Sequence, residues 1–584
     1  MLIGKIAASI RQYKKDSILT PVYVIFESML EIIIPTLMAY LIDYGINEKN
    51  MSYVLGMGSV LVILAMFSLL TGFLSGRSAA IASSGLARNL RHDMFYNVQK
   101  FSFSNIDKFS TASIITRLTT DVTNVQNAFQ MLIRLAVRAP VMVVFALIFS
   151  FRIDAHLSLI FLAVIPVLGI GLGLIMSHVH PIFVRVFNAY DRLNNVVQEN
   201  LHGIRVVKSY IREDHERQKF AGISQAIFRD FSKAEKRLAF NMPLMQFCLF
   251  ASMLLLSWFG AKEIIAGGNN PAIGLSTGEL TSLITYAIQI LMSLMMLSMA
   301  FVMIIISRAS AERIVEILNE GSDLKNGESP IYNVKDGSIT FEDVTFIYAQ
   351  RADKPVLDGI NLSIESGETV GIVGGTGSSK SSLVQLIPRL YDVVRGRVTV
   401  GGIDVRDYDI ESLRNQVAMV LQKNVLFSGT IKENLRWGHE NATDEEMIHA
   451  CELAQADDFI RNFPNQYDTY IEQGGANVSG GQKQRLCIAR ALLKKPKILI
   501  LDDSTSAVDT KTDGLIRQAF KKDIPNTTKI IIAQRVSSVQ DADKIVVLDD
   551  GKINAVGSHD ELLQTCAIYR EVYESQNKGD VLHE

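Results

Sequence analysis

The sequence predicts two different halves: a membrane domain of six α-helical spans, followed by an α/β domain that carries a phosphate-binding loop. Three observations support this fold class. Long apolar stretches recur up to about residue 306. Beyond residue 330, strand patterns alternate with glycine turns and amphipathic helices, and a glycine-rich loop at 371–383 joins a strand pattern to a helix. We therefore expect one domain over residues 1–325 and a second over 326–584.

The composition fits a membrane part joined to a soluble part. Of the 584 residues, 48% are hydrophobic and 20% are charged, and the mean hydropathy is positive. The net charge of −2 gives no bulk basicity, so we expect no nucleic-acid partner. The four cysteines show no CxxC or histidine spacing, which argues against a disulfide framework or a zinc site.

Six stretches are apolar and long enough to cross a bilayer, since one helical crossing takes about 20 residues. They lie near 21–42, 54–75, 134–151, 156–177, 243–265 and 280–306. The basic, amphipathic segment before the first of them has no small-residue cleavage site. We therefore expect an interfacial helix at the start of the chain rather than a signal peptide.

The distribution of charge predicts the orientation of the spans. The connections 77–133 and 178–242 are rich in Arg and Lys, whereas those near 43–53, 152–155 and 266–279 are short and poor in both. By the positive-inside rule, the N-terminus, the two long connections and the C-terminal half are cytosolic in a multi-pass protein of the cell membrane. Because the long connections have helical patterns with few breakers, we expect spans two to five to continue as helices beyond the bilayer.

The segment GIVGGTGSSKSSL, residues 371–383, nearly matches the phosphate-binding pattern G-x-x-x-x-G-K-[ST]. Backbone N–H groups of such a loop surround the phosphates of ATP, Lys380 neutralises the β/γ oxygens, and the Ser381 hydroxyl holds Mg²⁺. Ser379 replaces the last glycine and adds a side chain to a crowded turn. Alone, such a loop can also be a structural turn. The predicted nucleotide-binding residues here are Gly375, Thr376, Gly377, Ser378, Ser379, Lys380, Ser381 and Ser382.

A second segment adds a metal site. KILILDD, residues 497–503, is an apolar strand pattern that ends in carboxylates. Asp502 is suited to hold Mg²⁺ together with Ser381, because this ion prefers oxygen ligands.

A third segment points to a family. VSGGQKQRLCIARAL, residues 478–492, resembles the signature motif of ATP-binding cassette (ABC) proteins and is the most specific segment of the sequence. FIY, ending at Tyr348, resembles the aromatic loop that stacks on adenine. VLQKNVLFSGTIKENL, residues 420–435, resembles the glutamine loop of the family, which implies that Gln422 lies near Mg²⁺ and the attacking water.

The resemblance covers nearly the whole chain. Segments 114–122 and 196–213 look like intracellular helices of ABC exporters, and segments near 105–112 and 209–218 correspond to their coupling helices. The chain thus resembles a half-transporter. This resemblance implies that two halves dimerise, with each ATP held between the phosphate loop of one half and the signature motif of the other. The residues that would contact the nucleotide of the partner are Ser479, Gly480, Gly481 and Gln482.

Three residues depart from the pattern of active family members. Asp503 stands where a glutamate polarises the attacking water, and its shorter stem withdraws the carboxylate by about 1 Å, which can lower the rate about 100-fold. Gln534 replaces the histidine that contacts the γ-phosphate, and an amide cannot carry positive charge. With Ser379, they predict a degenerate site that binds ATP and hydrolyses it poorly, under an intact signature motif.

This asymmetry predicts the degenerate-site subunit of a heterodimeric multidrug exporter, whose partner half-transporter supplies the competent residues. Two alternatives stay open. One is a homodimeric exporter of lipids, peptides or drugs with slow turnover, and the other is an ATP-gated regulatory subunit without chemistry of its own. The candidate catalytic residues are Asp503, Gln534 and Gln422, and the candidate Mg²⁺ ligands are Ser381, Gln422 and Asp502.

The membrane half offers candidate substrate contacts. Glu27 and Glu31 are four residues apart in the first span, hence on one face of a helix. Carboxylates within a bilayer face a cavity or a partner group, so these two either attract cationic, amphipathic compounds, bond to a neighbouring helix, or line a wet lateral opening. Met292 and Met296 of the sixth span form a polarizable surface that suits varied apolar ligands, or else face membrane lipids or fill the core.

Overall fold

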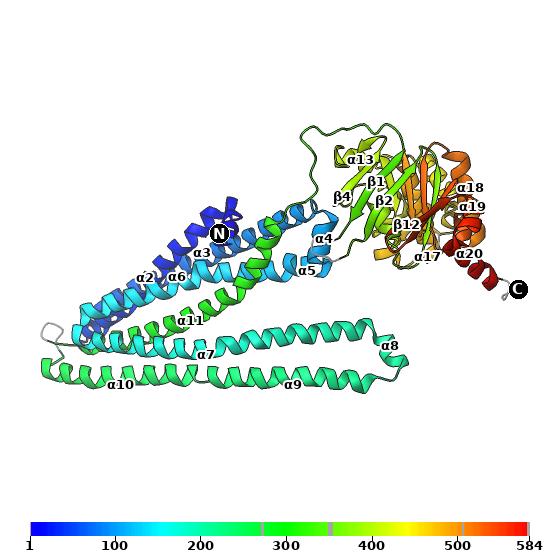
Figure 1. Ribbon diagram of the computed structural model, residues 1–584. Coiled ribbons are helices and arrows are strands. Elements are labelled where there is room, and N and C mark those ends of the chain that lie inside the picture. Colours follow the sequence, from blue (N-terminus) through cyan, green and yellow to red (C-terminus); the bar gives the residue numbers. More distant parts are fainter. Residues whose placement is uncertain (1, 270–273, 349–353, 505–506, 581–584) are drawn as a thin grey trace. The chain divides into compact units, whose positions relative to one another are not determined.

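The computed structural model of the protein describes residues 2–269, 274–348, 354–504 and 507–580 (Figure 1). The chain divides into two units. The first comprises Met1–Gln99 and Thr111–Glu320, and the second comprises Lys100–Ser110 and Gly321–Glu584.

The first unit is helical throughout its described secondary structure. Its described residues contain six segments that are long and apolar enough to cross a membrane, namely Arg11–Asn47, Met51–Val98, Thr111–Ile153, Ala155–His202, Glu213–Gly267 and Thr277–Asn319. Each contains one of the predicted spans, which confirms the six-span prediction. The second to fifth segments also extend well beyond those spans, as the helical patterns of the long connections predicted.

The α-helices of this unit are α1 Leu2–Ala8, α2 Lys14–Tyr40, α3 Met51–Val98, α5 Thr111–Thr116, α6 Val122–Ile153, α7 Ala155–His202, α8 Ile204–Ser209, α9 Glu213–Leu238, α10 Asn241–Gly267 and α11 Thr277–Asn319. Capping residues in the sequence explain where two of these helices begin. Asp154 caps the start of α7 by accepting the Leu157 N–H, and Ser276 forms a capping box with Glu279 at the start of α11.

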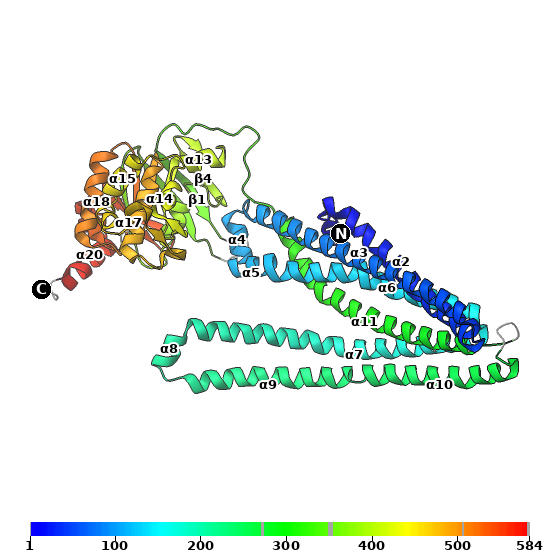
Figure 2. The same cartoon turned by 180° about the vertical axis from the view of Figure 1, so that it is seen from behind.

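Helix α7 lies alongside α9 and α10, and the short helix α8 joins them at one end (Figures 1 and 2). The buried side chains between α7 and α9 include Val179, Ile182 and Val186, with Ala234 opposite them. The connection that was predicted to be helical therefore forms a two-helix arm, held together by this apolar packing and by ion pairs such as Arg185 with Asp230 and Lys219 with Glu199.

A partly buried ion cluster joins the first and third spans. Arg138 Nη1 on α6 donates to Glu27 Oε1 at 2.7 Å, and its Nη2 donates to both carboxylate oxygens of Glu31 at 2.8 and 2.7 Å. Ser75 on α3 donates to the other oxygen of Glu27 at 3.3 Å. The Glu27 side chain is only 9% exposed, so these partners supply the hydrogen bonds and counter-charge that its burial requires. The structure thus shows the bond to a neighbouring helix, which is one of the three alternatives for this glutamate pair, and the other two stay predictions.

Loss of the cation from this cluster is expected to destabilise the membrane unit. Arg138→Met leaves Glu27 buried without its counter-charge and should cost about 3 kcal/mol, whereas combining it with Glu27→Gln and Glu31→Gln should recover most of the loss. Arg134→Met is the matched control, because among the described residues Arg134 has no ion-pair partner. Thermal unfolding of the detergent-solubilised variants measures the effect, and equal melting temperatures for the two Arg→Met variants would contradict it.

The second unit contains two main sheets within its described residues. The larger has the strand order β12-β11-β3-β10-β9-β6, with β12 antiparallel to β11 and the other neighbouring strands parallel. The smaller is antiparallel, in the order β2-β1-β4-β5. The strands are β1 Ile339–Phe346, β2 Leu357–Ile364, β3 Thr369–Gly374, β4 Arg395–Val400, β5 Ile403–Asp404, β6 Val417–Val420, β7 Gly429–Thr430, β8 Tyr470–Ile471, β9 Ile498–Asp502, β10 Thr528–Ile532, β11 Lys544–Asp549 and β12 Lys552–Gly557.

Helices surround these sheets. They are α4 Phe103–Phe109, α12 Lys380–Gln385, α13 Ile410–Gln416, α14 Ile431–Arg436, α15 Asp444–Leu453, α16 Asp457–Arg461, α17 Gly480–Leu493, α18 Thr510–Asp523, α19 His559–Thr565 and α20 Ala567–Asp580. Helix α4 comes from the connection between the second and third spans, and it joins this unit through a hydrogen bond from Tyr391 to Asp107 at 2.8 Å. With these strands and helices, the predicted α/β fold is confirmed.

Parallel register brings distant parts of the sequence to one edge of the larger sheet. Ile532 of β10 pairs with Asp502 of β9 on one side and with Ile372 of β3 on the other. All residues of β9 and β10 are buried, which is typical of parallel strands covered on both faces. Because the carboxyl ends of these strands coincide, Gly374, Asp502 and the residues after Ile532 meet at this edge.

Candidate functional site

A cavity of about 350 Å³ lies at the carboxyl edge of the larger sheet. It gathers most of the phosphate loop, the predicted metal ligands and the predicted catalytic residues. Ile532 also lines it, although the sequence did not single this residue out. The lining residues are Gly374, Thr376, Gly377, Ser378, Ser379, Lys380, Ser381, Ser382, Gln422, Asp502, Asp503, Ile532 and Gln534.

The phosphate loop turns sharply between β3 and α12, and two of its residues have left-handed backbone conformations. Gly377 has φ +85°, which glycine adopts without strain. Ser379 has φ +69° and ψ +23°, a conformation that costs a residue with a Cβ about 1–2 kcal/mol. The Ser379 side chain makes no capping hydrogen bond to α12 that would offset this cost. The missing glycine is thus a source of backbone strain in the loop.

Lys380 points into the loop that carries it. Its Nζ donates to the carbonyl oxygens of Gly374 and Gly375, both at 2.8 Å, and to Ser378 Oγ at 3.2 Å. Burial lowers the pKa of Lys380, while the charges of Asp502 and Asp503 oppose this shift. The ammonium is therefore partly desolvated and held by neutral acceptors, which phosphate oxygens can replace with stronger, charge-assisted hydrogen bonds.

Ser381 and Asp502 form a pair suited to a divalent cation. Ser381 Oγ donates to Asp502 Oδ1 at 2.9 Å, and Asp502 is only 3% exposed. Burial raises the pKa of Asp502, and the nearby charge of Asp503 raises it further. A positive ion would relieve both effects, and this hydroxyl and carboxylate are oxygen ligands of the kind that Mg²⁺ prefers. These residues therefore fit Mg²⁺, with the Gln422 side chain also at the cavity wall.

Two amides hold the carboxylate of Asp503, the predicted catalytic base. Gln534 Nε2 donates to Asp503 Oδ2 at 2.7 Å, and Gln422 Nε2 donates to the same oxygen at 3.4 Å. The backbone of Asp503 is left-handed, with φ +50°, and its N–H donates to the carbonyl of Ile532 at 3.0 Å. The side chains of Gln534 and Gln422 thus both contact Asp503, so the three predicted catalytic residues lie together.

Tyr348 stands beside the phosphate-loop helix rather than in the cavity lining. Its hydroxyl shares a hydrogen bond with Ser382 at 2.8 Å and donates to Gln385 at 3.2 Å. Its ring, 42% exposed with the rest of the residue, packs edge-on against Tyr391 and Phe346 at centroid distances of 5.1 and 4.8 Å. No local pattern in the sequence marks Tyr391, which the fold brings to this position.

The signature motif lies outside the cavity lining. Ser479 caps helix α17 in a capping box, in which its Oγ accepts the Gln482 N–H at 3.3 Å and Gln482 Oε1 accepts the Ser479 N–H at 2.9 Å. Ser479 and Gly480 are exposed, and a Cβ on Gly481 would come within 2.8 Å of the Ala507 carbonyl oxygen. The motif therefore presents the N-terminus of a 14-residue helix to the surroundings of the unit.

Family profiles match both halves of the chain. The family described as "ABC transporter transmembrane region" matches residues 18–310, and the family described as "ABC transporter" matches residues 357–506. The chain belongs to the ABC transporter family.

Relatives support this assignment along the whole length. The ABC transporter ATP-binding protein YfiB of Bacillus subtilis is 36% identical over 94% of each chain. The ABC transporter ATP-binding protein Rv1273c of Mycobacterium tuberculosis is 34% identical over 99% of this chain and 98% of its own. An ATP-dependent lipid A-core flippase of Desulfotalea psychrophila is 34% identical over 84% of each chain.

The ABC transporter is an exporter-type half-transporter, with its membrane domain fused to an ATP-binding domain, as the motifs predicted. It is a multi-pass membrane protein of a family that couples ATP hydrolysis to transport and works as dimers. The assignment also agrees with a site in which the phosphate loop and the Ser381–Asp502 pair fit ATP and Mg²⁺.

Replacing Ser379 by glycine is expected to stabilise the ATP-binding unit. Relief of left-handed strain, about 1–2 kcal/mol, exceeds the entropic cost of glycine, about 0.5–1 kcal/mol. The net gain of about 0.5–1 kcal/mol should raise the melting temperature by about 2–3 °C. Differential scanning calorimetry of the full chain measures it. Ser379→Ala keeps the Cβ and should give no gain, so equal gains for both variants would contradict the strain.

Proposed function

We propose that this ABC transporter is the degenerate-site subunit of a heterodimeric exporter in the cell membrane, with its N-terminus and ATP-binding domain in the cytosol. It binds ATP with Mg²⁺ at its own site and hydrolyses it slowly, while its signature motif completes the competent site of its partner. The domain division is that predicted from the sequence, at residues 325 and 326. The engagement of Asp503 by Gln534 is the observation that carries this proposal.

Hydrolysis requires a carboxylate free to accept a proton from the attacking water, within hydrogen-bond reach of it. Here one oxygen of Asp503 already accepts a 2.7 Å hydrogen bond from Gln534. An aspartate also reaches about 1 Å less far than a glutamate, a displacement that can cost about 100-fold in rate. Gln534 in turn offers no positive charge to the γ-phosphate. Both residues expected to act in hydrolysis, Asp503 as the base and Gln534 as the contact to the γ-phosphate, are therefore weaker than their usual counterparts.

The binding parts are preserved by comparison. Lys380 and the Ser381–Asp502 pair are assembled at the cavity, and the exposed capping box at Ser479 leaves the signature helix ready for a nucleotide held by another chain. A homodimer would join two weak sites, whereas a partner half-transporter with glutamate and histidine gives the signature motif a competent site to serve. The homodimer and the purely regulatory subunit remain the alternatives.

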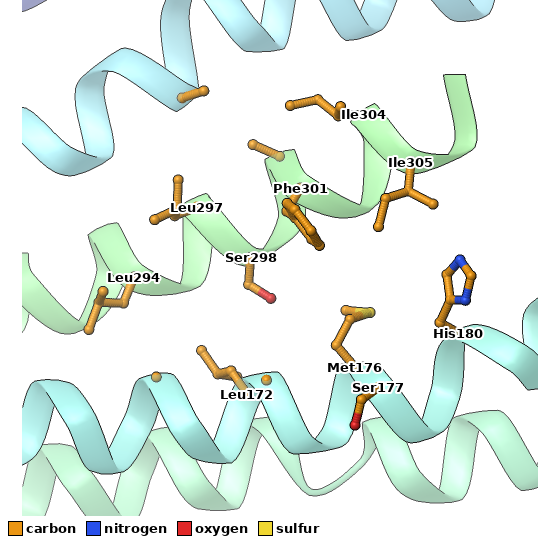
Figure 3. A pocket seen from close by; sticks show the side chains of 14 residues that line it. Leu172, Met176, Ser177, His180, Leu294, Leu297, Ser298, Phe301, Ile304 and Ile305 are labelled. Atoms are coloured by element: carbon orange, nitrogen blue, oxygen red, sulfur yellow. The ribbon is translucent and has the colours of Figure 1, made fainter. Parts of the chain in front are cut away.

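A pocket in the membrane unit supports a lipophilic substrate. It has a volume of about 670 Å³ and lies between α7 and α11, with one residue from α6 (Figure 3). Figure 3 shows Met176 of α7 and Phe301 of α11 pointing toward each other across it. Volumes of about 300–1,000 Å³ and mainly apolar linings are typical of small-molecule sites. The lining residues are Ala136, Gly169, Leu172, Gly173, Met176, Ser177, His180, Leu294, Leu297, Ser298, Ala300, Phe301, Ile304 and Ile305.

The substrate contacts predicted from the sequence lie elsewhere. Glu27 and Glu31 are bonded to Arg138, and Met292 and Met296 are 46% and 43% exposed but do not line the pocket. Met292 and Met296 stay predicted contacts with substrate or membrane lipids. For an amphipathic, multidrug-type substrate, the pocket between α7 and α11 is the better-supported site. A lipid remains the alternative, since one relative is named as a lipid A-core flippase.

If Asp503 and Gln534 make ATP hydrolysis slow at this site, replacing both residues should raise the ATPase activity. The full chain, reconstituted alone in lipid nanodiscs that each hold two copies, should bind MgATP with negligible turnover. The double variant Asp503→Glu/Gln534→His restores the reach of the base and a group that can be protonated, and should raise Mg²⁺-dependent ATPase activity about 100-fold. Phosphate release measures the rate.

Lys380→Ala in the double-variant background is the control, because loss of the phosphate-binding cation should abolish the gained activity. Robust turnover of the unmodified chain would overturn the degenerate-site proposal and favour the homodimer. Unchanged low turnover of the double variant, with ATP bound, would locate the defect elsewhere in the site.

The pocket predicts where a lipophilic dye binds. Gly173→Trp places a large ring in the pocket, and nothing lies within 4 Å of a Cβ added at this position. It should therefore weaken binding of rhodamine 6G by about tenfold, equivalent to about 1.4 kcal/mol. Fluorescence anisotropy with the chain in nanodiscs measures the affinity. Gly58→Trp on α3 is the matched control, with equal space and no place in the lining, and equal losses in both variants would contradict the site.

A further inference from the structure

The C-terminal helix α20 packs against the ATP-binding unit through one face. Tyr569 is 1% exposed, and Val572 and Tyr573 pack against the same apolar core. Their spacing of three and four residues places all three on one side of the helix. His559 of α19 fixes this side further, through a 2.7 Å hydrogen bond with the Tyr569 hydroxyl and an edge-on ring contact with Tyr573.

Gln576 continues this face by one more turn, and it is the polar member of the row. Its Nε2 donates to the backbone carbonyl oxygen of Gln534 at 2.8 Å, and its Oε1 accepts the backbone N–H of Val536 at 2.9 Å. One side-chain amide thus holds the backbone on both sides of Arg535. Because the amide donor and the amide acceptor of Gln576 both bond to this loop, they fix its position and its orientation.

Gln576 holds the backbone of Gln534, and the side chain of Gln534 faces the nucleotide cavity. The Gln534 side chain lines that cavity and donates to Asp503 at 2.7 Å. The described contacts therefore form a continuous path from the buried face of α20, through Gln576, to the backbone of Gln534 and on to Asp503. None of the nucleotide-site motifs includes α20, which lies more than thirty residues further along the chain.

We propose that Gln576 is a positioning residue that sets the preference of this site for ATP over ADP. It holds the loop so that Gln534 reaches the γ-phosphate, the one group that distinguishes the two nucleotides. The proposal rests on the proposed function, because it requires nucleotide binding at this site. ADP binding depends on the phosphate loop and the adenine contact, which α20 does not touch through Gln576.

The test measures two affinities with the full chain in nanodiscs. Fluorescent N-methylanthraniloyl ATP and ADP are titrated with Mg²⁺ into the wild type, Gln576→Ala and Gln576→Glu. Gln576→Ala loses two hydrogen bonds to the loop and should weaken ATP about fivefold, with ADP affinity unchanged. Gln576→Glu retains the acceptor for the Val536 N–H but cannot donate to the Gln534 carbonyl, so its loss should be intermediate.

Gln518→Ala is the matched control, since Gln518 is an exposed helical glutamine in the same unit. Hydrogen exchange of the segment 533–540 without nucleotide gives a second readout, and it should be faster in Gln576→Ala only. Equal ATP-to-ADP preference in the wild type and Gln576→Ala would overturn the positioning role, as would equal weakening of both nucleotides. A wild type that binds neither nucleotide would instead overturn the proposed function, and the inference with it.

Discussion

The nucleotide site depends on the parallel pairing of β3, β10 and β9. Ile532 pairs with Ile372 and with Asp502, so the three strands end together and their following loops share one edge. A shift of either register by one residue would turn Asp502 to the other face of the sheet and separate it from Ser381. The complete burial of β9 and β10 opposes such a shift, because the close-packed side chains on both faces of these strands would have to be repacked. The packing of these strands thus fixes where the Asp502 carboxylate stands.

At this edge of the sheet, the residues suited to bind a nucleotide differ in charge from those expected to act in hydrolysis. Lys380 and the Ser381–Asp502 pair offer a cation and oxygen ligands, which are the groups that hold MgATP. Asp503 is engaged by neutral amides and has no imidazole beside it at position 534. A nucleotide bound there can still act through contacts. Tyr348 packs on Tyr391, whose hydroxyl donates to Asp107 of α4.

Local patterns predicted the elements and the motif residues, because spans, phosphate loops and capping boxes have short sequence signatures. Glu27 and Glu31 were predicted to face either a cavity or a partner group, and Arg138 inside the predicted third span was the available signal for the partner. Tyr391 and Gln576 could not be found in this way. Tyr391 meets Asp107 across 284 positions and Gln576 meets Gln534 across 42, so only the tertiary fold gives them meaning. The left-handed Ser379 was anticipated as a crowded turn, but its strain required the backbone angles.

The two walls of the membrane pocket belong to differently held parts of the unit. Helix α11 is tied to its neighbours by polar contacts, such as the Tyr286 hydroxyl on the Ile32 carbonyl at 2.9 Å and the Ser282 hydroxyl on the Pro35 carbonyl at 2.6 Å. The stretch of α7 that carries Met176 and His180 belongs to the two-helix arm, in which apolar packing and polar contacts such as Arg237 on the His178 carbonyl oxygen at 3.0 Å hold α7 to α9. Directional hydrogen bonds resist sliding, so α11 keeps its place among its neighbours and α7 keeps its place in the arm. A change in pocket size therefore requires the arm to move as a whole against α11, which couples the shape of this pocket to the position of α8 at the far end of that arm.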